Sequence, residues 1–220
     1  MASETVENYL KTIDNLARES VTGEAAVSGI ATLLGVTKGS VSSMIRKLSA
    51  AGLAVAEPYG GVRLTPQGRK AASDVLRRHR LIELFLVEVV GLDWSEVHAE
   101  AERLEHAVSP KLLDRLDEML GRPKYDPHGD PIPDAAGRFD TAALVPLSAC
   151  TTGTKVVIGR ICDQGGDFLR FVDRTGLRPG TTVLVESVDP LAGAIVLKPK
   201  GRPAVTVSFA VAEKVLARAK

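Results

Sequence analysis

The order of apolar and polar residues predicts a chain that is mainly helical in its first half. Apolar residues recur three and four positions apart over residues 5–19, which is the spacing of one buried face of a helix. Two shorter segments follow at 26–34 and 39–53, and Gly35 between them favours a tight turn. Helical patterns return over 66–90, 95–108 and 109–120, and the pairs Thr65-Pro66 and Ser109-Pro110 are typical helix starts.

Residues 26–65 have the pattern of a winged helix-turn-helix. An ordinary helical hairpin is the alternative, but two short apolar segments around Tyr59-Gly60-Gly61 predict a β-hairpin directly after the second helix. The predicted exposed face of that helix has hydroxyls and cations and no acid, which suits the major groove of DNA. The residues expected to contact DNA are Thr37, Lys38, Gly39, Ser40, Ser42, Ser43, Arg46 and Lys47, with Arg63 on the hairpin.

The pattern changes to short strands after residue 145. Segments 155–161, 168–172, 182–188, 194–198 and 205–209 predict five strands of a small SH3-like barrel, and 210–218 predicts a closing strand or helix. Residues 121–133, with four prolines and two glycines, predict an extended connector. The expected fold is therefore mainly α: a winged helix-turn-helix domain (1–73), a helical dimerisation domain (74–140) and a C-terminal SH3-like β-barrel (146–220).

Composition and charge refine this picture. No apolar run approaches the length of a membrane span, so we expect a cytoplasmic protein with no membrane partner, and two cysteines are too few for a disulfide framework. The net charge is +2 over residues 1–73, −6 over 74–145 and +5 over 146–220. An acidic middle segment that holds most of the histidines would attract divalent cations, while basic flanks permit contact with a polyanion. Apolar residues in the middle segment, among them Leu84 and Phe85, exceed what a small domain buries and favour a dimer.

Two His–carboxylate clusters in the middle segment are candidates for metal binding. On a helix, His98, Glu102, Glu105 and His106 would share one stripe, although Arg103 among them also fits a solvated face of ion pairs. His79 and Glu83, four residues apart on the preceding helix, favour the metal-binding interpretation. Imidazole and carboxylate together suit first-row divalent ions. His128 in the connector is expected to be an ordinary loop histidine.

These features together resemble the diphtheria-toxin-repressor family of metal-dependent transcriptional repressors. The resemblance rests on the winged helix, the motifs H-R-L-I-E and V-H-x-E-A-E-x-x-E-H, the G-D-P-I-P connector and the SH3-like (FeoA-like) tail, and it covers nearly the whole chain. It implies a homodimer that binds a two-fold symmetric operator in double-stranded DNA, with divalent metal as corepressor. It also implies two metal sites per subunit.

The family's sites map onto particular residues of this chain. The resemblance implies a primary site of Asn8, Glu102, Glu105 and His106, and an ancillary site of His79, Glu83 and His98, completed by Gln164 and Asp167. Glu102 stands where the iron-responsive branch has Cys, so oxygen ligands favour Mn(II), with Fe(II) as the alternative. Asn8 departs from both branches and could equally be a helix cap, and Q-G-G-D at 164–167 is also typical of a hairpin turn.

Two other functions compete with the repressor. A metal hydrolase is the main alternative class, but no nucleophile or base stands beside an obvious open metal position, and a protease-like H-E-x-x-H is absent. A winged-helix regulator that senses a small organic ligand would leave the His–Glu clusters unexplained. We therefore expect a regulator of metal homeostasis genes and not an enzyme.

Overall fold

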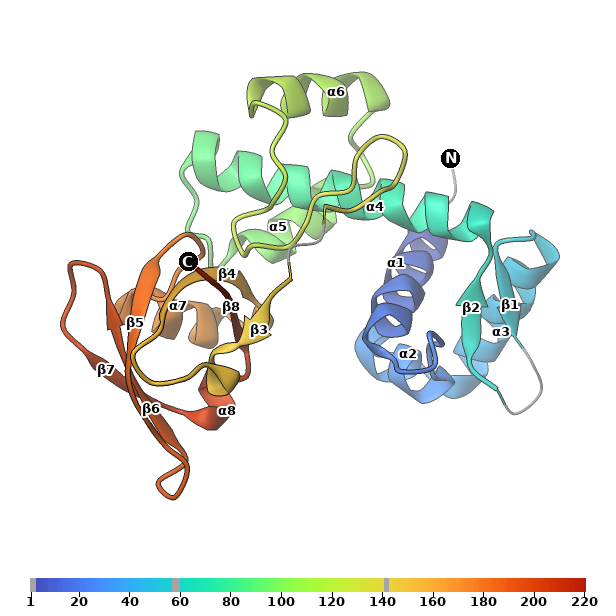
Figure 1. Ribbon diagram of the computed structural model, residues 1–220. Helices are drawn as coiled ribbons and strands as arrows, with labels where there is room; N and C mark the ends of the chain where they lie inside the picture. Colours follow the sequence, from blue (N-terminus) through green and yellow to red (C-terminus); the bar gives the residue numbers. More distant parts are fainter. Residues whose placement is uncertain (1–2, 57–59, 141–142) are drawn as a thin grey trace. The chain divides into compact units, whose positions relative to one another are not determined.

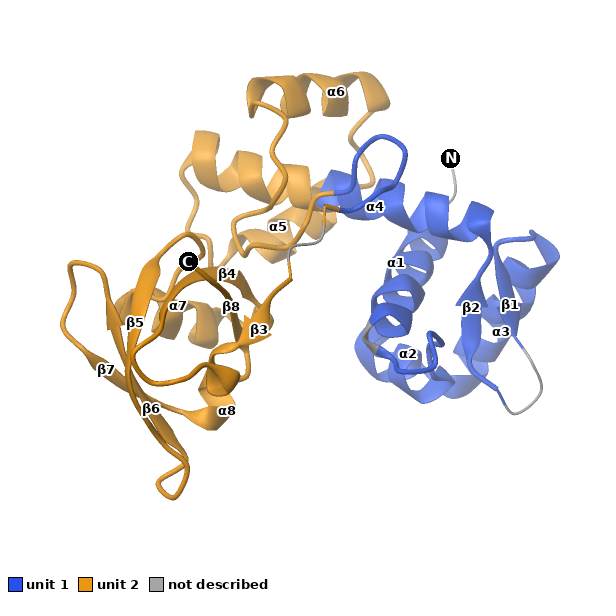
Figure 2. Cartoon of the chain, in the orientation of Figure 1, with its two compact units in different colours: residues 1–79, 133–139 blue, residues 80–132, 140–220 orange. Residues whose placement is uncertain are grey.

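The computed structural model describes residues 3–56, 60–140 and 143–220 and divides the chain into two compact units. Unit 1 comprises Met1–His79 and Pro133–Phe139, and unit 2 comprises Arg80–Ile132 and Asp140–Lys220. The boundary falls inside one continuous helix, directly after His79 (Figure 2). This division is coarser than the three domains predicted from sequence, whose boundaries remain a prediction.

Unit 1 contains the predicted winged helix (Figure 1). Gly35 ends the second helix in the left-handed region (φ 63°), and the Thr37 side chain accepts a hydrogen bond from the Ser40 backbone N–H at the start of the third. The two short strands pair antiparallel, with Ala54 opposite Leu64. Of the predicted turn, Tyr59 lies outside the described residues. The elements are α1 (Glu4–Glu19), α2 (Val27–Leu34), α3 (Lys38–Ala50), β1 (Ala54–Ala56) and β2 (Val62–Leu64).

Three helices follow as predicted: α4 (Pro66–Phe85), α5 (Val97–Leu104) and α6 (Pro110–Met119). The Thr65 hydroxyl caps α4 by accepting from the Gly68 N–H, and a π-helical turn (Leu86–Val90) extends it to Gly91. The predicted end of α5 at residue 108 is wrong, since the helix ends at Leu104. Residues 105–107 form a turn instead, and Ser109 is extended as the cap of α6, which rules out one helix through residue 108 into α6.

The last part of unit 2 is an antiparallel sheet of six strands in the order β3-β8-β4-β5-β6-β7 around one apolar core. We call it the C-terminal barrel. Alternate residues of β4, β5 and β6 face inward, and α8 caps the sheet (Figure 1). The strands are β3 (Val145–Pro146), β4 (Lys155–Ile161), β5 (Thr182–Asp189), β6 (Ala194–Pro199), β7 (Val205–Ser208) and β8 (Val215–Ala219); the helices are a 3-10 turn (Leu147–Ala149), α7 (Gly166–Thr175) and α8 (Phe209–Ala212).

One predicted strand, at 168–172, is wrong: these residues lie in α7. Leu169 and Val172 are buried three positions apart and Arg170 between them is exposed, which is helical and not strand periodicity. Gly176, with φ 74°, ends the helix. The closing segment, predicted as a strand or a helix, contains both, as α8 and β8. No helix among the described residues is both long and apolar enough to cross a membrane.

Candidate metal centre and DNA-binding surface

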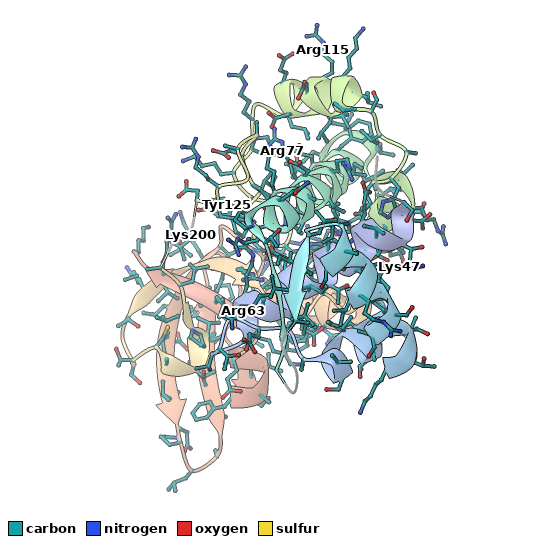
Figure 3. All side chains as sticks on the ribbon, turned by 90° about the vertical axis from the view of Figure 1, so that its right-hand side faces the viewer. Lys47, Arg63, Arg77, Arg115, Tyr125 and Lys200 are labelled. Atoms are coloured by element: carbon teal, nitrogen blue, oxygen red, sulfur yellow. The ribbon has the colours of Figure 1, made fainter. Side chains whose placement is uncertain are left out.

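The outward face of α3 has the chemistry of a DNA-reading helix. Val41, Ile45 and Leu48 are buried against the rest of unit 1, which turns the opposite face to solvent. Every residue that the sequence assigned to DNA contact on this helix is exposed. Figure 3 shows Lys47 on α3 and Arg63 on the hairpin. The surface thus presents hydroxyls, a glycine and cations and, along the helix itself, no acidic residue.

The predicted wing cation, Arg63, is held by an acid that the sequence did not point to. Its Nη2 lies 2.8 Å from the Glu24 carboxylate, and the same carboxylate accepts a hydrogen bond from the Gly61 backbone N–H at 2.9 Å. Glu24 therefore holds the start of β2 and sets the direction of Arg63. The Arg63 side chain remains about half exposed, at 55%, so it stays accessible to a phosphate.

The first metal-binding group lies on α4 and α5. Among the described residues, His79, Glu83 and His98 offer ligand atoms that all lie within 4.8 Å of one another. His79 and Glu83 come together because they are one helical turn apart. His98 Nδ1 lies 3.1 Å from a Glu83 carboxylate oxygen, and its Nε2 lies 3.6 Å from Glu102. The predicted ancillary trio is thus assembled in space.

A second group shares Glu83 with the first. Glu83, Asp126 and His128 also meet within 4.8 Å, and all three are buried. Asp126 and His128 belong to the connector, which packs closely against the barrel. The Ile161 N–H donates a hydrogen bond to the His128 carbonyl, and a Cβ on Gly129 would lie 2.0 Å from the Gly159 carbonyl oxygen. Gly129 therefore permits a close approach that no other residue could make.

The orientation of His128 fits a ligand. Its Nε2 lies 2.9 Å from the Trp94 carbonyl, which can only accept, so Nε2 must carry the proton. The other ring nitrogen, Nδ1, is buried, has no hydrogen-bond partner among the described residues and lies 3.9 Å from a Glu83 oxygen. A histidine that donates one ring N–H to a backbone carbonyl and offers the other nitrogen is the usual arrangement at a metal. The Trp94 ring stacks on this imidazole, with centroids 5.5 Å apart.

The electrostatics of the second group also favour a cation. Burial raises the pKa of Asp126 well above its usual range, and the neighbouring Asp130 and Glu83 carboxylates raise it further, while Arg80 opposes the shift. One Asp126 oxygen accepts backbone N–H groups of His128 and Asp130 at 2.8 and 2.9 Å. A divalent ion would offset the repulsion between the buried carboxylates, so the residues present fit a metal.

The remaining predicted ligands on unit 2 lie around the end of α5. Glu105 follows the last residue of the helix and is fully buried, and its carboxylate lies 3.4 Å from His106 Nε2. Glu102, one turn earlier, is exposed. His106 therefore does not continue the α5 stripe, as the sequence pattern predicted, but lies in the turn that follows it.

Asn8 is on α1 of unit 1, and its ligand role stays a prediction. The alternative interpretation of this residue as a helix cap is wrong, because α1 begins at Glu4 and its cap position is Ser3. Asn8 lies beyond the first helical turn. Since Asn disfavours helix interiors, its presence there needs a reason other than capping.

The structure does not bring Gln164 and Asp167 to the His79 group. The Asp167 side chain is fully exposed and pairs with Arg170 at 2.7 Å. Gln164 Nε2 instead donates to the buried Asp130 carboxylate at 2.7 Å, and Arg160 of β4 pairs with the same carboxylate at 2.7 Å. The barrel thus holds the connector, which contains Asp126 and His128, through Asp130.

This arrangement predicts different effects for the two barrel residues. We expect Asp167→Ala to leave Mn(II) affinity unchanged, because its charge is already paired in solvent. Gln164→Leu should weaken binding at the second group about tenfold, as losses of outer-shell partners do. Calorimetric titration of both variants with Mn(II) measures this. Equal losses of Mn(II) affinity in the two variants would instead indicate that Asp167 is a metal ligand.

Comparison with known proteins agrees with these features. The chain matches the models "Iron dependent repressor, N-terminal DNA binding domain" over residues 1–62, "Iron dependent repressor, metal binding and dimerisation domain" over 65–134 and "FeoA domain" over 145–219. It is 36% identical over 224 residues to the iron-dependent repressor IdeR of Mycobacterium leprae, covering 96% of each chain. The chain belongs to the diphtheria-toxin-repressor family. Its members are metal-dependent transcriptional repressors, which confirms the predicted function class and sets the hydrolase aside.

Solved structures of this family extend the comparison to three dimensions. A manganese-dependent transcriptional repressor in complex with manganese is 37% identical, with a TM-score of 0.88, over 98% of this chain and 100% of the other. ScaR with bound Cd2+ is 31% identical, with a TM-score of 0.80, over 98% and 99%. These similarities confirm the predicted fold class, including the winged helix and the SH3-like FeoA domain.

Asp126 was not predicted as a candidate ligand, and His128 was predicted to be an ordinary loop histidine. His128 is in a loop, as expected, but it is fully buried beside two carboxylates. A signal was present, because Asp126 and His128 are two residues apart in D-P-H, a spacing that lets both side chains reach one ion. Because both residues are far from Glu83 in the sequence, this signal did not show that the three residues meet.

Proposed function

We propose that this chain is a homodimeric repressor for which Mn(II) is the corepressor, and that it controls metal uptake genes through a two-fold symmetric operator. The observation that supports manganese is the hard, oxygen-rich ligand chemistry of the candidate groups. Neither cysteine belongs to them, and Glu102 supplies a carboxylate where a thiolate would favour softer ions. The cytoplasm, where its DNA partner would lie, is the proposed place of action.

We propose two metal sites per subunit. The first consists of Asn8, Glu102, Glu105 and His106, as the family resemblance implies. The second is centred on Glu83, with His79 and His98 on one side and Asp126 and His128 on the other. A bound ion supplies positive charge to these carboxylates. Glu83 belongs to both three-residue groups, Trp94 orients His128, and Asp130 holds the connector in place.

Iron is the second candidate for the corepressor. The observation in its favour is that the similar IdeR proteins are named iron-dependent, and Fe(II) accepts the same imidazole and carboxylate ligands. Calorimetric titration of the metal-free protein with Mn(II), anaerobic Fe(II) and Zn(II) distinguishes the two. We expect two Mn(II) sites per subunit. A protein that takes up Fe(II) at two sites and Mn(II) at none would overturn the choice of metal.

The helical segment supplies the surface for dimerisation. Large apolar side chains remain exposed between the end of α4 and α6, among them Val89, Leu112 and Met119. Burial of these side chains against a second copy would stabilise a two-fold dimer with two recognition helices. Two such helices read half-sites about one turn of DNA apart, which is why we propose a symmetric operator.

Asp126→Asn separates a ligand from a structural residue. The Asn side-chain oxygen can still accept the two backbone N–H groups, but the charge is gone. The pKa of Asp126 is higher in the folded state than in the unfolded state, so ionisation of this carboxyl lowers the stability of the fold once the pH exceeds the unfolded-state pKa. Without metal at pH 7, Asp126→Asn should therefore melt at a higher temperature than the parent protein. Its Mn(II)-induced rise in Tm should shrink by about 3 °C for each tenfold loss of affinity.

Thermal melts with and without Mn(II) test this prediction. Asp134→Asn, directly after the connector, with a side chain that is 42% exposed and paired with Arg138, is the matched control and should keep the full Mn(II)-induced shift. An Asp126→Asn variant that melts lower than the parent without metal and keeps the parent's Mn(II) shift would contradict the ligand role.

The recognition helix should separate phosphate contacts from base contacts. We expect Arg46→Ala or Lys47→Ala to weaken binding to every DNA sequence and to reduce the salt slope by about one for each lost phosphate contact. Ser43→Ala should instead alter base preference. Binding isotherms across a salt series, on a selected operator and on a scrambled duplex, measure both effects. A loss confined to the operator in Arg46→Ala would reverse these roles.

A further inference from the structure

The C-terminal barrel has a lysine-lined hollow that the metal centre does not use. The hollow has a volume of about 320 Å³, and we call it the lysine hollow. The residues that line it include Lys155, Lys198, Lys200 and Lys220, together with Thr182 and Leu184. Figure 3 labels Lys200, which directly follows β6. No acidic residue is part of the lining.

Strand register places these lysines on one outward face. Lys155 of β4 lies opposite Leu184 of β5, which in turn lies opposite Lys198 of β6. Directly opposed residues in antiparallel strands point to the same side of the sheet. The next row, Val156, Val183 and Pro199, is buried and faces the core, so the lysine row must face solvent.

The ends of the strands complete the row. The Lys200 backbone N–H donates to the Thr182 carbonyl, and the Lys220 N–H donates to the Lys155 carbonyl. Regular backbone pairing therefore fixes the positions from which all four side chains extend. These positions do not depend on any one side-chain conformation.

The charge of the lysine hollow is largely uncompensated within the described residues. Of its lysines, Lys198 has a nearby acid: its Nζ lies 3.6 Å from a Glu186 carboxylate oxygen. Like charges on one face of a sheet cost folding free energy, and an anion in the hollow would offset that cost. The excess agrees with the net charge of +5 over residues 146–220.

We infer that the lysine hollow binds the phosphate backbone of double-stranded DNA that flanks the operator. This inference rests on the DNA-binding function, because duplex DNA is the polyanion that this family binds. Lysines act on phosphate as point charges, without base preference. The lining includes no aromatic side chain on which an unstacked base could rest, which disfavours single strands and free nucleotides.

The test compares a short and a long duplex. The short duplex holds only the operator, selected from a random-sequence pool by the Mn(II)-loaded protein, and the long duplex adds flanking DNA on both sides. For the full-length Mn(II)-loaded protein, we expect Lys155→Gln/Lys200→Gln to lower the salt slope on the long duplex by about two and to leave the short duplex unchanged. Glu186→Gln should raise affinity for the long duplex only.

A charge-matched control and a second polyanion complete the design. Lys111→Gln/Lys214→Gln removes two cations outside the lysine hollow and should behave as the parent on both duplexes. Unchanged binding of Lys155→Gln/Lys200→Gln to the long duplex would overturn the inference and indicate that the lysine hollow binds no DNA. If this variant binds poly-glutamate more weakly than the parent but binds the long duplex equally well, the ligand is an acidic peptide. The short duplex measures metal-dependent operator binding separately. If the proposed repressor function is wrong, the parent protein will show no Mn(II)-dependent binding to the short duplex.

Discussion

Glu83→Gln should cause the largest loss of metal binding of any single change at the proposed second site. Glu83 is 1% exposed and is the one residue common to both three-residue groups. The amide keeps the size of the side chain but removes the charge that His98 and His128 face across the site. We expect Mn(II) affinity at this centre to fall about 100-fold or more, since in the proposed site Glu83 binds the ion directly, and loss of a residue that only supports a ligand already costs roughly 10- to 100-fold.

Calorimetry with Mn(II) measures this loss as the disappearance of one of two binding events. Glu88→Gln, on the π-helical turn that extends the same helix and exposed, is the matched control and should retain both. Two undiminished events in Glu83→Gln would show that neither group is a metal site.

Glu105→Gln and His106→Ala should abolish the metal dependence of operator binding. Glu105 is fully buried and lies 3.4 Å from His106, so the pair forms a fixed carboxylate–imidazole unit at the end of α5. Without it, Mn(II) has no anchor at the proposed first site. We therefore expect operator affinity with Mn(II) to fall to the level of the metal-free protein, while α3 itself is untouched.

Fluorescence anisotropy with the selected operator, with and without Mn(II), checks this prediction. Glu100→Gln changes a partly exposed acid of α5 that pairs with Arg103, and it should keep the full Mn(II) response. A Glu105→Gln protein with the parent's Mn(II) response would remove this pair from the mechanism.

Local periodicity predicted most of the elements. The helices of unit 1 and the strands β4, β5 and β6 follow directly from apolar spacing, because each has one buried face. The prediction of a strand at 168–172 was wrong because a short apolar run fits a helix as well as a strand. The apolar residues of this run are Phe168, Leu169, Phe171 and Val172. Only the exposed Arg170 and the length of α7 distinguish a helix from a strand there.

The residues of the candidate metal centre were predictable where they are close in sequence and were missed where they are not. His79 and Glu83 are one helical turn apart, and the pairing with His98 follows from two neighbouring helices. Asp126 and His128 reach Glu83 only because the connector folds back against β4, where Gly129 permits the contact. Such a long-range approach leaves no periodic signal in the sequence.

Divalent metal controls DNA binding in the proposed mechanism, and one titration tests this claim directly. Labelled operator, selected from a random-sequence pool, is titrated with the full-length protein in Mn(II) and again in excess chelator at the same ionic strength. We predict tight, sequence-selective binding with Mn(II) and only weak, sequence-independent binding in chelator. Equal operator affinity under the two conditions would contradict the claim.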